Sequence, residues 1–487
     1  MLPALPAAYN FTTPYSIWYN DAGNYPPSVY NPGDAAQYGF IVDDDTHWPR
    51  HNGTISASFG VEDGPEWPNF LFGLTNNSYD PWAGVGNVSW TSKKNCEDLP
   101  GGSAARRDSP IGPVCCSRVG GCVPQEADMA ALTAMVSESV QKLVPPDMTG
   151  NCVLDMESWA PVVDLDGQFG NTFAHCPILG DEDSGTAGKK RPRPIPKPMI
   201  VGATLWYNYS CALVRQRSPH LSEAEVVATA AREFLSAATA VWVQVIRVAK
   251  SVRPRCHWGF FGEWAVCAYH NLCTNQTATS GDPLCGFMNP KYREKIWNIT
   301  QQQLPIIAEA DALYPDLYIG SPRMHGYDGV SIGYRRGEMR SIVGQAVAGG
   351  DAVGGRPVLP FARTACMFGT LGCYGKALND SVFLSPEAVY AGLAVPYEVG
   401  AAGVVLYQEQ EAVHDPAELA KQLATVTGPY GRELLTAIRG CARERCSGHG
   451  RCMPLPSNFT DKDVVVHCQC DAHWSGSVCE RKGPSLS

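Results

Sequence analysis

Apolar residues recur at two different spacings in the central and later parts of the chain. A spacing of three to four residues, typical of one face of a helix, runs through Met129, Leu132, Val136, Val140 and Leu143. Short unbroken apolar runs lie between such repeats, and the run at 152–154 is typical of a buried strand. The pattern therefore predicts alternating helices and strands from about residue 129 onward.

Local signals mark where the expected helices begin and end. Pro145 and Pro146 end the first helix, and Pro254 follows the second. Ser222 and Glu225 have the spacing of a capping box at the start of the second helix. The expected helices cover about 129–143, 222–253, 292–313, 335–348, 385–399 and 415–438.

The expected strands are short, and most of them follow a helix. They cover 15–18, 56–59, 152–154, 257–261, 316–319, 357–361 and 403–407. Alternation of this kind favours parallel strands with helices outside them. About seven or eight strands in a chain of this length predict an α/β fold of the TIM-like (β/α) barrel type.

Two stretches interrupt the alternation, and both are predicted to be long surface loops. The first, about 93–125, is rich in Gly, Pro and Ser and contains Cys96, Cys115, Cys116 and Cys122. The second, about 176–200, is rich in Pro and contains Lys189, Lys190, Arg191, Arg193 and Lys197. The basic stretch is interpreted as a solvated insertion, with contact to an anionic polymer or a protease site as alternatives.

Length and charge limit the classes of function. The 487 residues suit one large α/β domain, expected over 1–438, and a small module over 439–482. A formal net charge of -10 argues against binding nucleic acid or anionic membranes by bulk attraction. No apolar run approaches the roughly 18 residues of a membrane span, so no transmembrane segment is predicted. An anionic substrate would require local Arg or Lys side chains.

Cysteines and glycosylation sequons predict a secretory route. Nineteen Cys are unusual in a reducing compartment, and nine Asn-X-Ser/Thr sequons accompany them. The first residues are a poor signal peptide, which is interpreted as a removed leader or an incomplete start. The odd number of Cys requires at least one thiol that is free or paired between chains. The sequons are Asn10, Asn52, Asn76, Asn87, Asn208, Asn275, Asn298, Asn379 and Asn458.

Six of the Cys lie close together at the C-terminal end. The spacing from Cys441 to Cys479 is Cys-x4-Cys-x5-Cys-x15-Cys-x-Cys-x8-Cys, and it resembles an EGF-like module. The resemblance implies the pairs Cys441–Cys452, Cys446–Cys468 and Cys470–Cys479, which the spacing alone leaves open. A zinc site is the alternative, but the spacing lacks the paired Cys-x2-Cys of zinc knuckles.

Two carboxylates follow the apolar run at 152–154. Asp155 and Glu157 are two residues apart, so on a strand they face the same side, roughly 6.5–7 Å apart. The carboxyl end of a barrel strand is where barrel enzymes place their catalytic groups. Glycosidic cleavage needs a proton donor, and one of two neighbouring carboxylates can stay protonated for this role. The spacing by itself occurs often, and most instances are solvated pairs.

The segment Gly150–Pro161, which contains both carboxylates, resembles the active-site strand of the hyaluronidase family of glycoside hydrolases. The family's usual core is Asp-Trp-Glu-x-Trp-Arg-Pro, and this chain has Asp155-Met-Glu157-Ser-Trp159-Ala-Pro161. The resemblance covers about residues 127–480. Further similar segments follow in family order at Arg253-Pro254, Trp258–Phe260, Ala312–Pro315, Pro357–Phe361 and Gly400–Leu406.

The resemblance implies a retaining endo-hydrolase that cleaves β-1,4 N-acetylhexosaminide bonds in a glycosaminoglycan, hyaluronan or chondroitin, without metal or other cofactor. Glu157 would be the general acid and then the base, while the substrate's own 2-acetamido oxygen attacks the anomeric carbon. Asp155 would orient and stabilise that acetamido group, and Tyr318 would hydrogen-bond beside it. Arg336 would pair with a uronate carboxylate. Trp159 is a further substrate-binding candidate, and a Cys267–Cys285 disulfide is implied.

The chain departs from the family at several positions around this pair. Phe261 stands where the family has a Tyr whose hydroxyl holds the acetamido group, and Tyr269 or Tyr407 are candidate substitutes. Tyr407 itself replaces a Trp, and Ala160 replaces an Arg. The family's disulfide between the first strand and the last helix has neither Cys here. These changes leave the expected acid in place and put substrate choice and rate in doubt.

Two other functions remain open at this stage. One is hydrolysis of another N-acetylhexosamine polymer such as chitin, although the Asp-x-x-Asp-x-Asp-x-Glu run of chitinases is missing. The other is a catalytically weak glycan-binding surface protein, which Phe261 favours and Glu157 disfavours. Without the resemblance, the favoured interpretation of Tyr318 is a core aromatic and that of Arg336 is a solvated residue at the start of a helix. In each case the expected location is extracellular or in the lysosomal lumen.

Overall fold

The computed structural model describes, apart from single residues, 122–155, 160–163, 169, 197–262, 284–317, 332–363, 383–409, 421–454, 466–470 and 474–483. Before residue 118 it describes the backbone of five strands. These are β1 (Tyr15–Asn20), β2 (Phe40–Asp44), β3 (Thr54–Ser58), β4 (Ala104–Ser109) and β5 (Gly112–Ser117).

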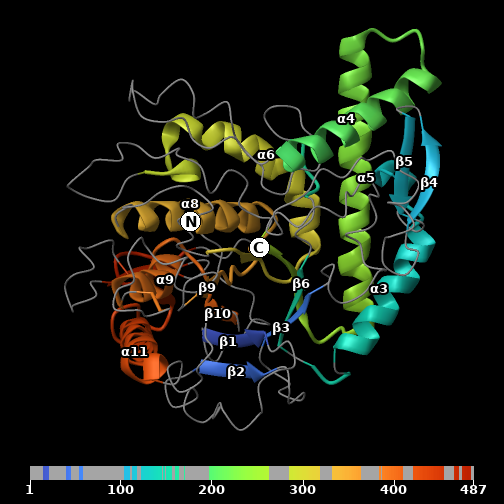
Figure 1. The fold of residues 1–487 in the computed structure, drawn as a ribbon. Coiled ribbons are helices and arrows are strands. Elements are labelled where there is room, and N and C mark those ends of the chain that lie inside the picture. Colours follow the sequence, from blue (N-terminus) through green and yellow to red (C-terminus); the bar gives the residue numbers. More distant parts are fainter. Residues whose placement is uncertain are drawn as a thin grey trace.

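Eight strands run parallel to one another (Figure 1). One sheet has the order β2-β1-β10-β9 and the other the order β3-β6-β7-β8. Parallel bridges from Leu313 to Val358 and from Asp316 to Phe361 join β8 to β9. The later strands are β6 (Asn151–Asp155), β7 (His257–Gly262), β8 (Tyr314–Pro315), β9 (Phe361–Arg363) and β10 (Val404–Glu409).

The order of these strands is that of a (β/α) barrel opened at one seam. Each strand lies beside its neighbour in sequence, in the run β3-β6-β7-β8-β9-β10-β1-β2. Between the two ends of the run, β2 and β3, the described strands form no hydrogen-bonded ladder. The structure therefore confirms a parallel α/β fold, and closure of the barrel stays a prediction.

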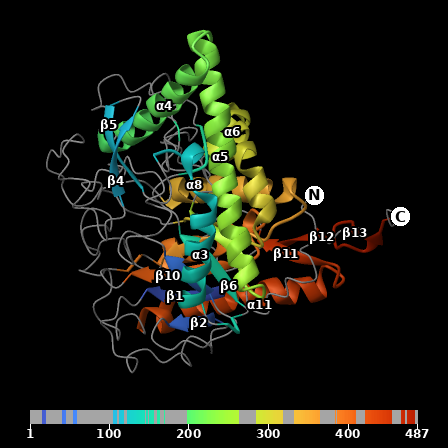
Figure 2. The ribbon, with the colours of Figure 1, turned by 90° about the vertical axis from the view of Figure 1, so that its right-hand side faces the viewer.

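Helices cover the outside of the strands (Figures 1 and 2). Ser222 and Glu225 form the expected capping box at the start of α5, and the Asp128 side chain caps α3. The helices are α3 (Met129–Leu143), α4 (Lys197–Arg217), α5 (Glu223–Val252), α6 (Pro290–Glu309), α8 (Ile332–Ala352), α9 (Pro386–Glu398) and α11 (Gly428–Glu444). Short turns of other helix types lie at Pro124–Glu126, Gly286–Met288 and Leu423–Thr427.

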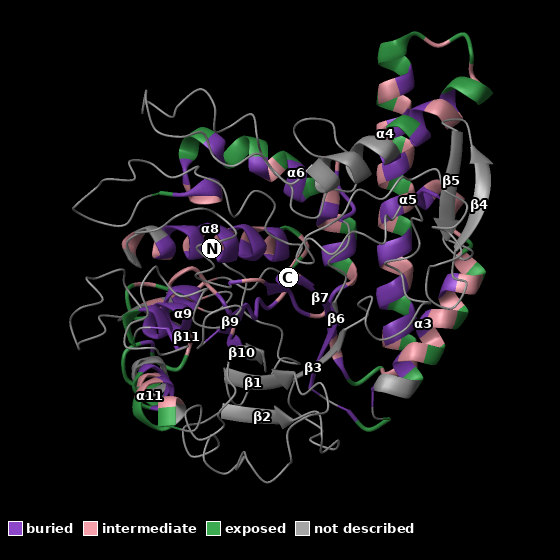
Figure 3. Cartoon of the chain, viewed as in Figure 1, coloured by how far each residue is buried: buried purple, intermediate pink, exposed green. Residues whose placement is uncertain are grey.

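The described side chains of β6 to β10 are buried on both faces, because they alternate between the inner side of the strands and the helices (Figure 3). Residues at alternate positions belong to separate core clusters. The inner cluster contains Val153, Phe261, Ala312, Tyr314, Leu359, Phe361 and Val405. The outer cluster, against the helices, includes Cys152, Leu154, Trp258, Phe260, Leu313, Leu317 and Val358.

Helix α5 is the longest helix of the described chain and is the one helix there that is long and apolar enough to cross a membrane. Its buried residues form a stripe at helical spacing that includes Phe234, Ala238, Trp242, Val245 and Ala249. Trp242 packs against Phe260 of β7 with ring centroids 4.4 Å apart. The apolar face of α5 therefore covers the outer side of the strands.

Gly259 allows the interior of the fold to close around Tyr314. A Cβ atom added at Gly259 would lie 2.0 Å from the Ala312 carbonyl oxygen and 2.9 Å from the Tyr314 ring. The Tyr314 hydroxyl donates a hydrogen bond of 2.8 Å to the His257 carbonyl, so the ring has little freedom to retreat. Only a residue without a side chain fits between these groups.

We therefore expect Gly259→Ala to lower the free energy of unfolding by about 3 kcal/mol or to prevent folding, because a backbone oxygen has to move. Thermal unfolding of the purified protein measures this. Gly440→Ala is a matched control, since a Cβ there meets no atom within 4 Å and the site is helical. Equal stability of the two variants would contradict the packing argument.

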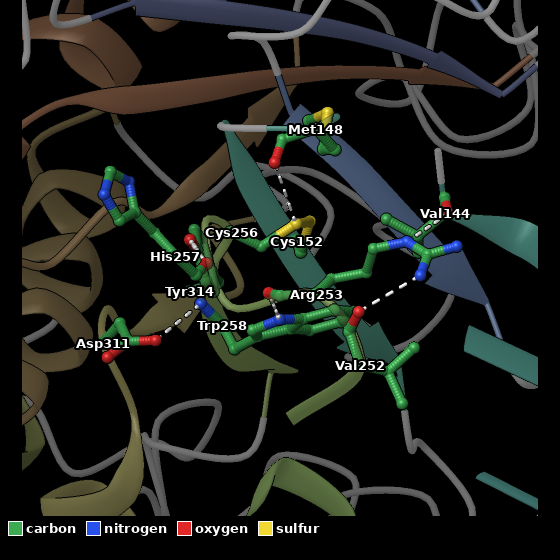
Figure 4. Close-up of a disulfide and its surroundings, with 10 residues drawn as sticks. All are labelled: Val144, Met148, Cys152, Val252, Arg253, Cys256, His257, Trp258, Asp311 and Tyr314. Atoms are coloured by element: carbon green, nitrogen blue, oxygen red, sulfur yellow. Dashed lines mark hydrogen bonds between the residues drawn. A yellow bond between two sulfur atoms is a disulfide. The ribbon is translucent and has the colours of Figure 1, made fainter. Parts of the chain in front are cut away.

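A disulfide and a hydrogen-bond network hold the amino-terminal ends of β6 and β7 (Figure 4). Cys152 of β6 is bonded to Cys256, which directly precedes β7, and both are buried. The Arg253 guanidinium donates to the carbonyls of Val144 and Gln141 at 2.6 and 3.1 Å, which fixes the end of α3. The Trp258 indole donates to the Arg253 carbonyl at 3.0 Å.

Asp311 extends this network to the start of β8. Its carboxylate accepts from the Lys250 ammonium at 2.6 Å and from the Trp258 amide at 3.2 Å. Burial lowers the pKa of His257, against the opposing effect of Asp311, so the uncharged imidazole is favoured. The amino-terminal end of three adjacent strands is thus anchored by structural contacts.

The two predicted loops contain regular structure, which corrects the sequence interpretation. Within 93–125, β4 and β5 form an antiparallel hairpin, and within 176–200 helix α4 begins at Lys197. The hairpin was missed because the sequences of its two strands, Ala104–Ser109 and Gly112–Ser117, show no alternation of apolar and polar residues. The helix was missed because prolines precede it, although Pro198 in its first turn has no intrahelical amide bond to lose.

The C-terminal segment contains two small antiparallel pairs (Figure 2). Disulfides join Cys446 to Cys468 and Cys470 to Cys479, two of the pairs that the EGF-like resemblance implies. Cys441 lies within α11, so the boundary predicted at 438/439 falls inside this helix. The strands are β11 (Gly450–Pro454), β12 (Val466–Cys470), β13 (Trp474–Ser475) and β14 (Arg481–Lys482).

Among the described residues Cys211 on α4 is a free, buried thiol, in line with the odd number of Cys. Burial raises the pKa of this thiol, so it is protonated and unreactive at neutral pH. Cys122 and Cys285 are disulfide-bonded, and their partners are not among the described residues. The Cys267–Cys285 pair therefore stays a prediction.

Candidate active site

Asp155 is the last residue of β6, at the carboxyl end of the parallel run. Its backbone pairs with Ser58 of β3, and the preceding residue, Leu154, pairs with Phe260 of β7. Asp155 is therefore level with Phe261 and follows the inward-facing Val153 by two residues. This position is where parallel α/β barrels place catalytic side chains.

Several predicted site residues lie outside the described part of the chain. They are Glu157, Trp159, Tyr269 and Tyr318. For Asp155 and Tyr407 the backbone is described and the side chain is not. The catalytic and binding roles expected for these six residues therefore remain proposals.

Phe261 belongs to the inner cluster and is 6% exposed. Its ring packs edge-on against Phe361 of β9, with centroids 5.0 Å apart. The neighbouring inward residue on β8, Tyr314, pairs with Phe261 in register, but its hydroxyl is bonded to His257. The rings of Phe361 and Tyr314 therefore give Phe261 aromatic neighbours on β9 and β8.

Tyr407 of β10 lies directly beside Arg363 of β9 in the parallel register. The same row of backbone positions continues through Trp18 of β1 to Asp43 of β2. Arg363 follows the inward-facing Phe361 by two residues and is 4% exposed. A buried guanidinium thus belongs to the carboxyl end of the interior.

Sequence reasoning missed Arg363 as a site residue. The signal was available, because Arg363 follows the apolar run 357–361 by two positions and shares the face of Phe361. The predicted strand ended at 361, whereas the observed strand begins there. Because the observed strand extends two residues further than the predicted one, Arg363 lies on the inner face of a strand and not in a loop.

Arg336 lies on α8, outside the ring of strands, and is partly buried. Its neighbour Arg335 is 5% exposed and forms an ion pair of 2.7 Å with Glu338, one turn along the helix. Burial raises the pKa of Glu338, and Arg335 opposes this effect. The structure therefore places the predicted substrate arginine beside a second, buried arginine that sequence reasoning did not select.

Two predicted sequon asparagines, Asn208 of α4 and Asn298 of α6, are exposed on helices. The other seven are outside the described residues. Across the described ranges no group of three His, Cys, Asp or Glu side chains is arranged to hold a metal ion.

A parallel (β/α) array of this strand order is the architecture of barrel enzymes, which place their catalytic groups at the carboxyl ends of the strands. The hyaluronidase family model matches residues 201–461, more than half of the chain. The chain belongs to the hyaluronidase family.

The individual relatives have low sequence identity to this chain, but the matches cover most of its length. Hyaluronidase-3 of Sus scrofa is 24% identical over 75% of this chain and 77% of its own length. A chondroitin hydrolase of Caenorhabditis elegans is 20% identical over 74% of this chain and 67% of its own length. The bee venom hyaluronidase solved with a hyaluronic acid tetramer has a TM-score of 0.50 at 14% identity, covering 86% of this chain and 98% of that one, which shows a shared fold.

Proposed function

We propose that the chain is an endo-acting glycosidase that cleaves β-1,4 N-acetylhexosaminide bonds in a glycosaminoglycan. The observation that carries this proposal is the position of Asp155 at the carboxyl end of β6, two residues before Glu157. A closed barrel and an EGF-like C-terminal module belong to the same proposal, as does delivery through the secretory pathway.

Glu157 is the proposed general acid. It donates a proton to the leaving oxygen of the glycosidic bond and then takes one from the attacking water. The 2-acetamido oxygen of the substrate attacks the anomeric carbon, so the configuration is retained and the protein supplies no nucleophile. Asp155 orients the acetamido group and stabilises the positive charge that forms on it, with Tyr318 as a further hydrogen-bond donor.

The proposed substrate is hyaluronan or chondroitin, which carry a uronate on alternate sugars. Relatives named hyaluronidase and chondroitin hydrolase support both. Since the chain has a net charge of -10, local cations must hold the polyanion, and Arg336 is the proposed partner of a uronate. The wall around Phe261 is apolar and is suited to the sugar face.

Incubation of the secreted protein with hyaluronan and with unsulfated chondroitin tests the proposal. Endo-cleavage shortens the polymer early, before much reducing sugar is released, and size-exclusion chromatography measures this. If neither polymer is shortened across the acidic and neutral pH range, the proposed function is wrong. Cleavage of chitin oligomers instead would support a different N-acetylhexosamine polymer as substrate.

The apolar contact between Phe261 and Phe361 favours a second candidate, a glycan-binding protein with weak catalysis. Such a protein would bind hyaluronan without shortening it. Binding measured by surface plasmon resonance, together with an unchanged polymer size, would favour this candidate over the hydrolase.

We expect Phe261→Tyr to raise the rate of polymer cleavage several-fold, because a hydroxyl at this inward position adds a donor for the acetamido group. Initial rates at fixed polymer concentration measure the effect. Phe260→Tyr is the matched control, since Phe260 faces α5 and packs on Trp242. An unchanged or lower rate for Phe261→Tyr would mean that the site works with an apolar wall.

A further inference from the structure

Asp316 is a carboxylate on the inner face of the strands that has no role in the function proposed above. Leu313 and Leu317, three residues before and one residue after Asp316, have their side chains in the outer cluster, while Tyr314, two residues before it, belongs to the inner cluster. The amide of Leu317 donates to the Phe361 carbonyl at 2.8 Å, which continues the β8–β9 pairing past Asp316. Asp316 therefore shares the inward face of Tyr314.

The register places Asp316 at the carboxyl end of the interior. Its backbone is level with Phe361 of β9, and it follows Tyr314 by two residues. Tyr314 is level with Phe261, and Phe261 is level with Asp155. Asp316 therefore lies two strands away from Asp155 and two residues further toward the carboxyl end. This corresponds to a Cα separation of about 12 Å along the sheet. Glu157 is two peptide units from Asp155, at most about 7 Å.

We infer that Asp316 is a third carboxylate of the candidate site and sets the pH range over which the general acid stays protonated. The inference rests on the proposed function and deepens it. A negative charge on the same face of the strands raises the pKa of a neighbouring carboxyl group, because ionisation would bring two like charges together. Asp316 acts through Glu157 and does not touch the reacting atoms.

Other charged groups near Asp316 set the background field. Arg363 on β9 shares the inner face and is the diagonal neighbour of Asp316 in register. The outer helix α8 carries more distant charges, and β7 has one titratable described residue, at its far end. These groups are Arg335, Arg336, Glu338, Arg340 and Asp351 on α8, of which Arg340 is paired with Glu398 of α9, and His257 on β7.

The test is the pH dependence of kcat/KM for polymer cleavage in Asp316→Asn. The general acid must be protonated, so kcat/KM falls as pH rises through its pKa. Removing the Asp316 charge lowers that pKa, and the descending limb moves to lower pH by about 0.5 unit, or about threefold in kcat/KM on that limb. Asp316→Glu retains the charge and is expected to keep the wild-type profile.

Asp311→Asn is the matched control, because Asp311 lies at the opposite end of the same strand and binds Lys250. Its profile should keep the wild-type midpoint even if stability falls. A descending limb that is unchanged in Asp316→Asn, or moved equally in Asp311→Asn, overturns the inference.

A second measurement separates this inference from the proposed function. Carbon-13 NMR of protein labelled at glutamate carboxyls follows the titration of Glu157, whose signal is assigned by its loss in Glu157→Gln. The inference expects the pKa of Glu157 to be lower in Asp316→Asn than in wild type. If wild type cleaves neither polymer, the proposed function fails, and the titration still decides whether the two carboxylates interact.

Discussion

Glu157→Gln is expected to abolish cleavage of the polymer, with a loss of at least about a hundredfold in kcat. The amide is nearly isosteric with the carboxylic acid but cannot donate the proton that the leaving oxygen requires. In the proposed mechanism Glu157 is the only proton donor to the leaving oxygen. The substrate's 2-acetamido group replaces a protein nucleophile, but it does not replace this acid. The measurement is the initial rate of size reduction under the best conditions for wild type.

Folding of Glu157→Gln should persist, since the substitution removes a charge and leaves the size and shape of the side chain nearly unchanged. A thermal unfolding midpoint close to wild type is the control. Asp155→Asn should also lower kcat, because the acetamido group loses its charged partner. A Glu157→Gln protein that retains more than a tenth of the wild-type rate would assign the acid role to another residue.

The second large effect is expected from loss of the Cys152–Cys256 disulfide. The bond closes a loop with a sequence separation of 104 residues and joins the starts of two adjacent strands. A cross-link of this span restricts the unfolded chain strongly, so Cys152→Ala with Cys256→Ala should lower the free energy of unfolding by about 2–5 kcal/mol. Alanine is preferred to serine because both sites are buried.

The measurement is chemical or thermal unfolding of the double variant against wild type under oxidising conditions. Cys211→Ala is the control, because it removes a buried sulfur without opening a loop. A loss no larger than that of the control would show that the strand pairing and the Arg253 network suffice to hold this end. Cleavage by the folded double variant should remain, since the bond lies at the end of the strands opposite to Asp155.

These two predictions concern opposite ends of the same strands. One tests the residues proposed for catalysis, and the other tests the contacts that stabilise the fold. The amino-terminal ends are held by the disulfide, by Arg253 and by the Asp311 network, and those contacts leave the carboxyl ends to carry Asp155, Asp316 and Arg363.

The sequence by itself determined the alternation of helices and strands, the capping box at Ser222, and the position of Asp155 at the end of a strand. These features depend on spacing over a few residues, and local propensity and burial pattern determine them. The presence of an unpaired thiol followed from the odd number of Cys.

Only the tertiary structure decided which distant residues share a face. Strand register is set by pairing between segments far apart in sequence, so no local pattern placed Asp316 and Arg363 on the inner face or paired Cys152 with Cys256. The prolines before α4 concealed a helix that packs on α5, because contact with a neighbouring helix outweighs weak local preference.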